Sequence, residues 1–189
     1  MALTYSDIQA LGTPAPGFSL TGTDGRTYSL ESFQDAQILV VVFMCNHCPY
    51  VIAVQGRINA LTQEYHDRGV RLVAINSNDF RRYPDDSFAE MKKRSIQEEY
   101  VFPYLLDPSQ DVARAYHAAC TPDFFVYRRE SGRLLLRYQG RLDDSWKDPA
   151  QVKKRDLADG LDRLLIGDLA QADQKPSMGC SIKWISMTL

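Results

Sequence analysis

The chain has 189 residues, of which 44% are hydrophobic and 24% are charged, and its formal net charge is −2. This composition is that of a globular protein large enough to bury a core without disulfide bonds, and the near balance of basic and acidic residues argues against a nucleic-acid partner. The longest apolar run, residues 38–44, is too short to cross a bilayer, so we expect no membrane partner.

The first half of the chain predicts a hairpin followed by a strand–helix–strand unit. Residues 16–33 alternate apolar and polar side chains around Asp24-Gly25, a dipeptide typical of hairpin turns. The hydrophobic pattern then predicts a buried strand, a helix and a second buried strand, over residues 38–44, 49–69 and 70–76. A strand, a helix and a strand of this size imply a parallel βαβ unit.

The second half of the chain adds shorter elements and a second hairpin. The pattern predicts an amphipathic helix, an extended piece, a helix capped by Ser109, a hairpin and a final helix, over residues 86–99, 101–107, 109–117, 123–142 and 149–166. Parallel strands on one side, an antiparallel hairpin on the other and helices on both faces predict a three-layer α/β/α domain with a mixed central sheet. We expect one domain over residues 1–189, with a core of about 12–166 and a tail of 167–189.

The N-terminal segment lacks the basic and apolar regions of a secretory signal, since the first Lys or Arg is Arg26. We therefore expect a cytoplasmic protein. In a reducing compartment, cysteines are more often catalytic or metal-binding than structural. The chain has four of them: Cys45, Cys48, Cys120 and Cys180.

The stretch FMCNHCPYV, residues 43–51, places Cys45 and Cys48 between the first buried strand and the first helix. The reactive form of a cysteine is the thiolate, and the N-terminus of a helix favours an anion. His47, when protonated, can stabilise a thiolate further, and Pro49 is tolerated in the first helical turn. The site is suited to forming and breaking a disulfide.

A strand, C-x-x-C and a helix, followed much later by CTPDFFVY, resemble the thioredoxin superfamily. The N-terminal hairpin, the helical insertion near 84–100 and the closing PSMGCSIKW look like its peroxiredoxin-like branch of AhpC/TSA-type redoxins. The resemblance implies a thioredoxin fold with an N-terminal β-hairpin extension and a C-terminal tail. It also implies a cis bond between Thr121 and Pro122, which faces the cysteines and leaves the Thr121 main chain open to a substrate strand.

The pair departs from the patterns of both thioredoxins and peroxiredoxins. Peroxiredoxins carry T-x-x-C-P, and here Cys45 takes the place of the threonine that helps to hold the peroxide. We therefore expect a thiol–disulfide oxidoreductase in which Cys45 is the attacking thiolate and Cys48 resolves the mixed disulfide. The alternatives are a thiol peroxidase that uses Cys48, and a non-catalytic redox sensor or partner-binding module.

The expected partners are disulfide-containing proteins or small molecules and an upstream thiol reductant, and no prosthetic group is implied. We expect no metal site, because the chain has no second C-x-x-C and no H-x₃-H to complete a ligand set.

Two cysteines outside the pair are candidate auxiliary residues. Cys120 precedes Thr121, so the fold brings it near the active-site face, but a small buried hydrophobic residue is the simpler interpretation. Cys180 lies in the tail, where it either acts as a third redox cysteine or packs with Trp184 against the core. In both cases we expect residues 176–184 to be ordered.

Overall fold

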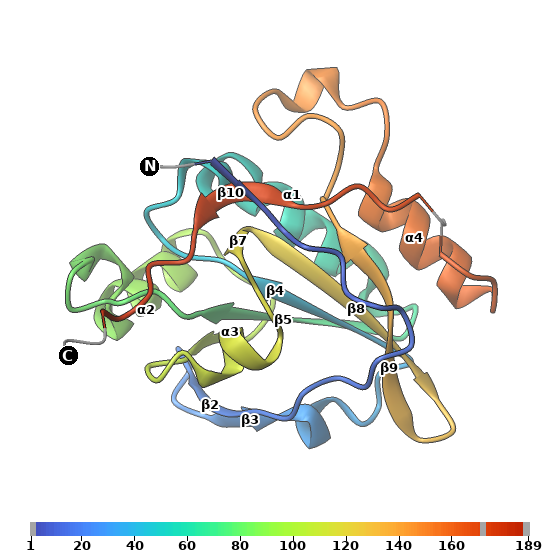
Figure 1. Ribbon diagram of the computed structural model, residues 1–189, viewed down its shortest axis with the longest axis horizontal. Helices are drawn as coiled ribbons and strands as arrows, with labels where there is room; N and C mark the ends of the chain where they lie inside the picture. The colour runs from blue at the N-terminus through green and yellow to red at the C-terminus, as the bar shows by residue number, and fades with distance from the viewer. Residues whose placement is uncertain (1–2, 171–172, 187–189) are drawn as a thin grey trace.

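The computed structural model describes residues 3–170 and 173–186. A seven-stranded mixed sheet runs through the centre of the molecule, in the order β3-β2-β6-β5-β4-β8-β9 (Figure 1). Strands β4, β5 and β6 are parallel, and the other pairings in this sheet are antiparallel. The strands are β2 (Ser19–Gly22), β3 (Thr27–Ser29), β4 (Ile38–Phe43), β5 (Val70–Asn76), β6 (Tyr104–Leu106), β8 (Asp123–Glu130) and β9 (Arg133–Gly140).

Strand β4 is buried on both faces, as the apolar run in its sequence predicts. Its alternate side chains enter two separate hydrophobic clusters, one on each face of the sheet. The first cluster includes residues of α1 (Pro49–His66), α2 (Phe88–Gln97) and α4 (Asp156–Leu165), and the second includes residues of α3 (Asp111–Ala115). The predicted three-layer α/β/α arrangement is therefore confirmed. Among the described residues, no helix is long and apolar enough to span a bilayer.

Both predicted hairpins are confirmed. Strands β2 and β3 pair across the Asp24-Gly25 turn, where Gly25 has a φ of +84° that favours glycine. Strands β8 and β9 pair across Ser131 and Gly132, both with positive φ. Three short 3₁₀ helices complete the chain between these elements: η1 (Leu30–Phe33), η2 (Pro84–Asp86) and η3 (Pro149–Gln151).

Three predicted helices begin later than expected. The helix predicted from residue 86 begins at Phe88, because residues 84–86 form η2. The last helix begins at Asp156 rather than 149, because the main-chain N–H groups of Lys153 and Lys154 donate to the Asp144 side chain instead of to a helical turn. The helix predicted from Ser109 begins at Asp111, because Gln110 adopts a left-handed conformation.

A second, smaller sheet was not predicted, and it contains the tail. Its three strands are β1 (Leu3–Tyr5), β10 (Met178–Ser181) and β7 (Cys120–Thr121), in that order, with antiparallel pairing. Strand β10 thus lies between β1 and β7 at the edge of the domain (Figure 1). The predicted order of residues 176–184 is confirmed. Ile182 is buried, and the Arg114 guanidinium lies 4.5 Å from the centre of the Trp184 ring.

Candidate active site

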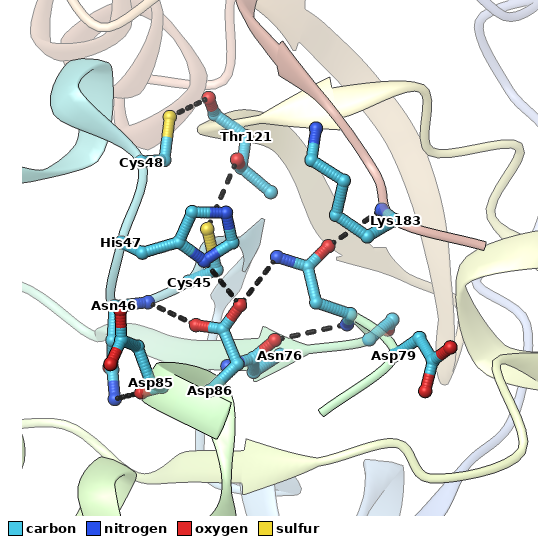
Figure 2. Close-up of polar contacts among 12 residues, drawn as sticks. Cys45, Asn46, His47, Cys48, Asn76, Asp79, Asp85, Asp86, Thr121 and Lys183 are labelled. Atoms are coloured by element: carbon cyan, nitrogen blue, oxygen red, sulfur yellow. Dashed lines mark hydrogen bonds and ion pairs between the residues drawn. The ribbon is translucent and has the colours of Figure 1, made fainter. Parts of the chain in front are cut away.

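The C-x-x-C pair lies in the turn that joins β4 to α1 (Figure 2). Strand β4 ends at Phe43, and Cys48 is the N-cap residue of α1, which begins at Pro49. A proline suits this position because its missing N–H would have no partner in the first turn. The turn therefore places Cys48 at the positive end of an 18-residue helix.

Thr121 contacts both thiols of the pair (Figure 2). Its carbonyl oxygen accepts a hydrogen bond from Sγ of Cys48 at 3.1 Å, and its hydroxyl oxygen lies 3.5 Å from Sγ of Cys45. The Thr121–Pro122 peptide bond is cis. The prediction of a cis bond beside the pair is therefore confirmed.

The two thiols differ in acidity in the order opposite to the predicted one. The hydrogen bond with Cys45 lowers the pKa of Cys48 to about 5, and the Val51 N–H in the first turn of α1 acts in the same direction. The same hydrogen bond, burial and the charge of Asp86 raise the pKa of Cys45 well above its usual value. Cys48 caps the helix and Cys45 lies one turn before it, so the order of acidity favours Cys48 over the predicted Cys45 as the attacking thiolate.

Other neighbours of Cys48 change the pKa of its thiol in opposite directions. Burial raises its pKa, and the carbonyl oxygen of Thr121 accepts a hydrogen bond from the thiol but would repel the thiolate. Side-chain hydrogen bonds from Thr121 and Cys180 favour the thiolate. Together with the Cys45 thiol they outweigh burial, so the negative charge of the pair lies on Cys48.

A buried carboxylate, Asp86, which was not among the predicted site residues, holds the turn in place. It accepts hydrogen bonds from the Asn46 main-chain N–H at 2.7 Å and from Nδ2 of Asn78 at 2.8 Å, and Nδ1 of His47 lies 2.6 Å from Oδ2 (Figure 2). Burial acts to raise the pKa of Asp86, but the hydrogen bonds from His47 and Asn78 hold it below its usual value. Only the run Asp85-Asp86 marked this place in the sequence, and acidic runs are common where helices start.

His47 has Asp86 as its main partner. Its imidazole pairs with this carboxylate and stacks on the ring of Tyr83, with 5.3 Å between the ring centres. The hydrogen bond to Asp86 raises the pKa of His47, and the charge of Cys48 contributes less in the same direction. The predicted action of His47 on the thiolate is therefore secondary to its role in holding the turn.

Three side chains of the metal-binding types meet here, since ligand atoms of Cys45, His47 and Asp86 lie within 4.8 Å of one another. The carboxylate oxygens, however, already accept hydrogen bonds from Asn46 and Asn78. N–H donors that point at an oxygen occupy the positions that a cation would need. The cluster is therefore better explained as a hydrogen-bond network than as a ligand set.

The structure of Cys120 agrees with the simpler of its two interpretations, that of a small buried hydrophobic residue. It is fully buried, its sulfur lies 3.8 Å from the Pro122 carbonyl oxygen, and burial raises the pKa of its thiol far above the usual value. A buried thiol of this kind is inert.

The Thr121 main chain is covered, which contradicts the prediction that it is open to an incoming strand. Strand β10 pairs antiparallel with β7, with Cys180 opposite Thr121 and Ser181 opposite Cys120. Thr121 is 3% exposed, and the cysteines of the pair are 2% and 0% exposed. The sequence could not show this, because the pairing joins segments about 60 residues apart whose register only the fold determines.

Two hollows adjoin the pair. A cavity of about 60 Å³ lies beside Pro122, with Val54, Trp146 and Met178 in its wall. A second, of about 340 Å³, is more polar and includes side chains of the turn and of α2: Asn46, His47, Glu90, Lys93 and Arg94. The first hollow is therefore bordered by the cis-proline, and the second by the two residues between the cysteines.

Solved structures include two that are similar over the whole chain. An uncharacterised conserved protein from Geobacillus kaustophilus is 43% identical, with a TM-score of 0.92, over 100% of this chain and 99% of that one. A hypothetical protein from Sinorhizobium meliloti 1021 is 39% identical, with a TM-score of 0.89, over 97% of this chain and 99% of that one. The comparison with curated proteins gave no significant match.

A more distant structure shares the fold. The thiol:disulfide interchange protein of the thioredoxin family from Chlorobium tepidum TLS is 22% identical, with a TM-score of 0.55, over 67% of this chain and 85% of that one. This likeness confirms the predicted thioredoxin fold. The family model of AhpC/TSA matches residues 11–132, which is more than half of the chain. The chain therefore belongs to the AhpC/TSA family.

Proposed function

We propose that this protein is a thiol–disulfide oxidoreductase in which Cys48 is the attacking thiolate and Cys45 is the second thiol. The observation that carries the proposal is that both thiols contact Thr121 of the cis-proline loop at the N-terminus of α1. Two sulfurs that share this neighbour across one turn can form a disulfide after a local movement. Membership of the AhpC/TSA family supports a redox role.

The reaction uses the different acidities of the two thiols. The Cys48 thiolate attacks a substrate disulfide, so that a mixed disulfide forms and the first substrate sulfur leaves as a thiolate. Cys45 then loses its proton to a departing substrate thiolate and attacks the Cys48 sulfur. The mixed disulfide breaks, the Cys45–Cys48 disulfide forms, and the substrate leaves as a dithiol.

The pKa of Cys45 changes in the direction that the second step requires. In the resting dithiol, the leading cause of its raised pKa is the hydrogen bond to Cys48. Once Cys48 is bound in a mixed disulfide, it no longer carries a negative charge, and this contribution is removed. Burial and the charge of Asp86 remain. The second thiol therefore becomes a better nucleophile only after the first step.

The proposed substrates are disulfides of proteins or small molecules, and an upstream thiol reductant restores the dithiol. No prosthetic group takes part in these steps. The physiological substrate must reach a pair that is almost completely buried, so substrate entry requires a local opening.

A second candidate is a thiol peroxidase, and the acidity of Cys48 favours it. An acidic thiolate at the start of a helix can attack a peroxide oxygen, which releases an alkoxide or hydroxide and leaves a sulfenic acid. Cys45 would then condense with the sulfenic acid to a disulfide and release water. The dithiol route is preferred because Cys45 replaces the threonine of the T-x-x-C-P pattern.

The test compares the two activities in the same protein. Reduction of insulin disulfides is measured with wild type, Cys48→Ser and Cys45→Ser, and Cys120→Ser serves as a control outside the pair. We expect wild type to accelerate insulin reduction, Cys48→Ser to abolish it, and Cys45→Ser to accumulate a mixed disulfide at Cys48.

Peroxide is tested in parallel by trapping sulfenic acid with dimedone and by following peroxide consumption. Rapid sulfenic acid formation at Cys48 without insulin reduction would replace the first candidate with the second. A pair that is inert in both assays would contradict both and would favour a non-catalytic redox sensor or partner-binding module.

A further inference from the structure

The tail strand β10 lies where a substrate strand would have to bind. An extended peptide can add to the edge of a sheet by main-chain pairing, and the edge next to the cysteine pair is β7. That edge is occupied by residues 178–181 of the same chain, which β1 holds from the other side. In this register Cys180 lies opposite Thr121, the residue that contacts both thiols.

The fit of β10 against the cis-proline loop depends on a glycine. A Cβ atom added to Gly179 would lie 2.0 Å from the carbonyl oxygen of Thr121 and 3.3 Å from the nitrogen of Pro122. The first distance is shorter than any real contact, and the atom it meets belongs to the main chain. Only a residue without a side chain allows β10 to approach this closely.

The same pairing brings a third thiol to the pair. Cys180 lies opposite Thr121, whose carbonyl oxygen accepts from Cys48, each of these two thiols shifts the pKa of the other, and both belong to the hydrophobic cluster that contains α1. They are 1% and 0% exposed, so both thiols are shielded from bulk solvent. The charge of Lys183 lowers the pKa of Cys180, and its ammonium group donates to the carbonyl oxygen of Ser181 at 2.7 Å.

We infer that Cys180 is a third redox residue of this protein and that it forms a disulfide with Cys48, with β10 in the place of a substrate strand. The inference rests on the proposed function, because that function supplies the Cys45–Cys48 disulfide. Cys180 attacks the Cys48 sulfur of this disulfide. The Cys48–Cys180 bond forms, the Cys45–Cys48 bond breaks, and Cys45 leaves as a thiolate that takes the proton from Cys180.

This exchange conserves electrons, so it needs no further oxidant. In the resting dithiol, burial raises the pKa of Cys180 to about 12, and the contact with Cys48 adds to the rise. The contribution of Cys48 disappears when that sulfur is part of a disulfide, while the ammonium group of Lys183 remains. Cys180 is therefore held as a thiol until the pair is oxidised, and it becomes reactive afterwards.

The structural consequence is that either β10 or an external substrate strand can pair with β7, but not both at once. When β10 is docked, the thiol opposite Thr121 is Cys180, and an external strand is excluded. When β10 leaves, a substrate strand can pair with Thr121 and present its own disulfide to Cys48. The tail thus competes with substrate at the same edge.

The test is disulfide mapping of the full chain. Reduced Cys45→Ser protein is treated with diamide, quenched in acid, alkylated and analysed by peptide mass spectrometry. We expect an intramolecular Cys48–Cys180 disulfide in a monomeric protein. Wild type treated with limiting diamide should give both Cys45–Cys48 and Cys48–Cys180 linkages, which shows that the Cys48–Cys180 bond forms without any substitution.

Two further variants separate this inference from the proposed function. Wild type should form Cys45–Cys48 and reduce insulin, and if it does neither, the proposed function fails; Cys180→Ser should lose the Cys48–Cys180 linkage. If Cys45–Cys48 forms in wild type but Cys45→Ser yields a Cys48–Cys120 bond, an intermolecular disulfide or free Cys180, the inference is overturned. Cys120→Ser is the matched control and should retain the Cys48–Cys180 linkage. Circular dichroism of each variant checks that it is folded. If a variant is not folded, the limiting-diamide result on wild type decides whether Cys48 and Cys180 form a disulfide.

Discussion

Nδ1 of His47 lies 2.6 Å from Oδ2 of Asp86, and this buried pair connects the active-site turn to η2, 39 residues further along the chain. The carboxylate also holds the turn through the Asn46 N–H. The charge of Asp86 is one cause of the raised pKa of Cys45, so the pair acts on geometry and on acidity together. A group with both effects can be tested by changing its charge while keeping its shape.

We predict that Asp86→Asn lowers the free energy of unfolding by about 1.5–3 kcal/mol, the range for hydrogen bonds to charged groups. It should also bring the pKa of His47 back toward 6.5, because the hydrogen bond to the Asp86 carboxylate is the main cause of the raised pKa and is lost. Urea denaturation and an NMR titration of the His47 ring measure the two effects. Asp85→Asn, at the exposed neighbouring carboxylate, is the control and should change neither.

The sign of the pH dependence of this pair follows from the two pKa shifts. The raised pKa of His47 stabilises the fold fully below pH 6.5, and this contribution is lost as the pH rises through the folded-state pKa. The lowered pKa of Asp86 stabilises the fold above about pH 4 and is lost as the pH falls. The difference between wild type and Asp86→Asn should therefore be largest between these limits. A difference independent of pH would mean that the pair is not ionised.

The second prediction concerns the acidity of the thiols. A titration of thiolate absorbance at 240 nm should show one group with a midpoint near pH 5 in wild type, assigned to Cys48 by its loss in Cys48→Ser. Cys45→Ala should raise this midpoint, because it removes the first cause of the low pKa. If Cys45→Ser abolishes the acidic titration and Cys48→Ser leaves it, the roles of the two cysteines are the reverse of those proposed.

The elements around the site could be predicted from the sequence because each depends on neighbouring residues. The run 38–43 is apolar on both faces, and the change of period at Pro49 marks the start of α1. The Thr121-Pro122 step could be placed beside the pair because a family pattern already joined the two motifs. Local pattern and family resemblance together thus locate the turn, the helix and the cis-proline loop.

The chemistry of the site could not be predicted, because it depends on contacts between distant segments. Asp86 meets Asn46 across 40 residues, and β10 meets β7 across about 60. Neither contact has a periodic signal in the sequence. The order of acidity depends on the contacts of the two thiols with Thr121 and Asp86, and the start of α1, which the sequence does predict, does not determine these contacts.

The third prediction concerns Asp123, a fully buried carboxylate that follows the cis-proline. Burial raises its pKa to about 7, above its unfolded value near 3.8. Between pH 4 and 7 the folded state keeps a proton that the unfolded state has lost, so the free energy of unfolding falls as the pH rises, by up to about 1.4 kcal/mol per pH unit.

Asp123→Asn should remove this dependence, because an amide does not titrate. Its oxygen can accept the Ala119 N–H, as the Asp123 carboxylate does at 3.4 Å, and its NH₂ can donate to the nearby hydroxyls of Ser6 and Ser177. Urea denaturation at pH 5 and pH 8 is the measurement. If the free energy of unfolding changes with pH equally in wild type and in Asp123→Asn, Asp123 is ionised in the folded protein throughout this range.

The last prediction is that Gly179→Ala releases β10 from the cis-proline loop. The added methyl group would lie 2.0 Å from the Thr121 carbonyl oxygen, and a main-chain atom cannot rotate away as a side chain can. We expect faster alkylation of Cys48 and Cys180 by a small maleimide and faster hydrogen exchange over residues 178–181, while the central sheet stays protected. Gly56→Ala in α1 is the matched control, because its methyl group meets no atom within 4 Å, and both rates should stay at wild-type values. Wild-type alkylation rates in Gly179→Ala, together with fast exchange of 178–181, would show that β10 does not shield the thiols.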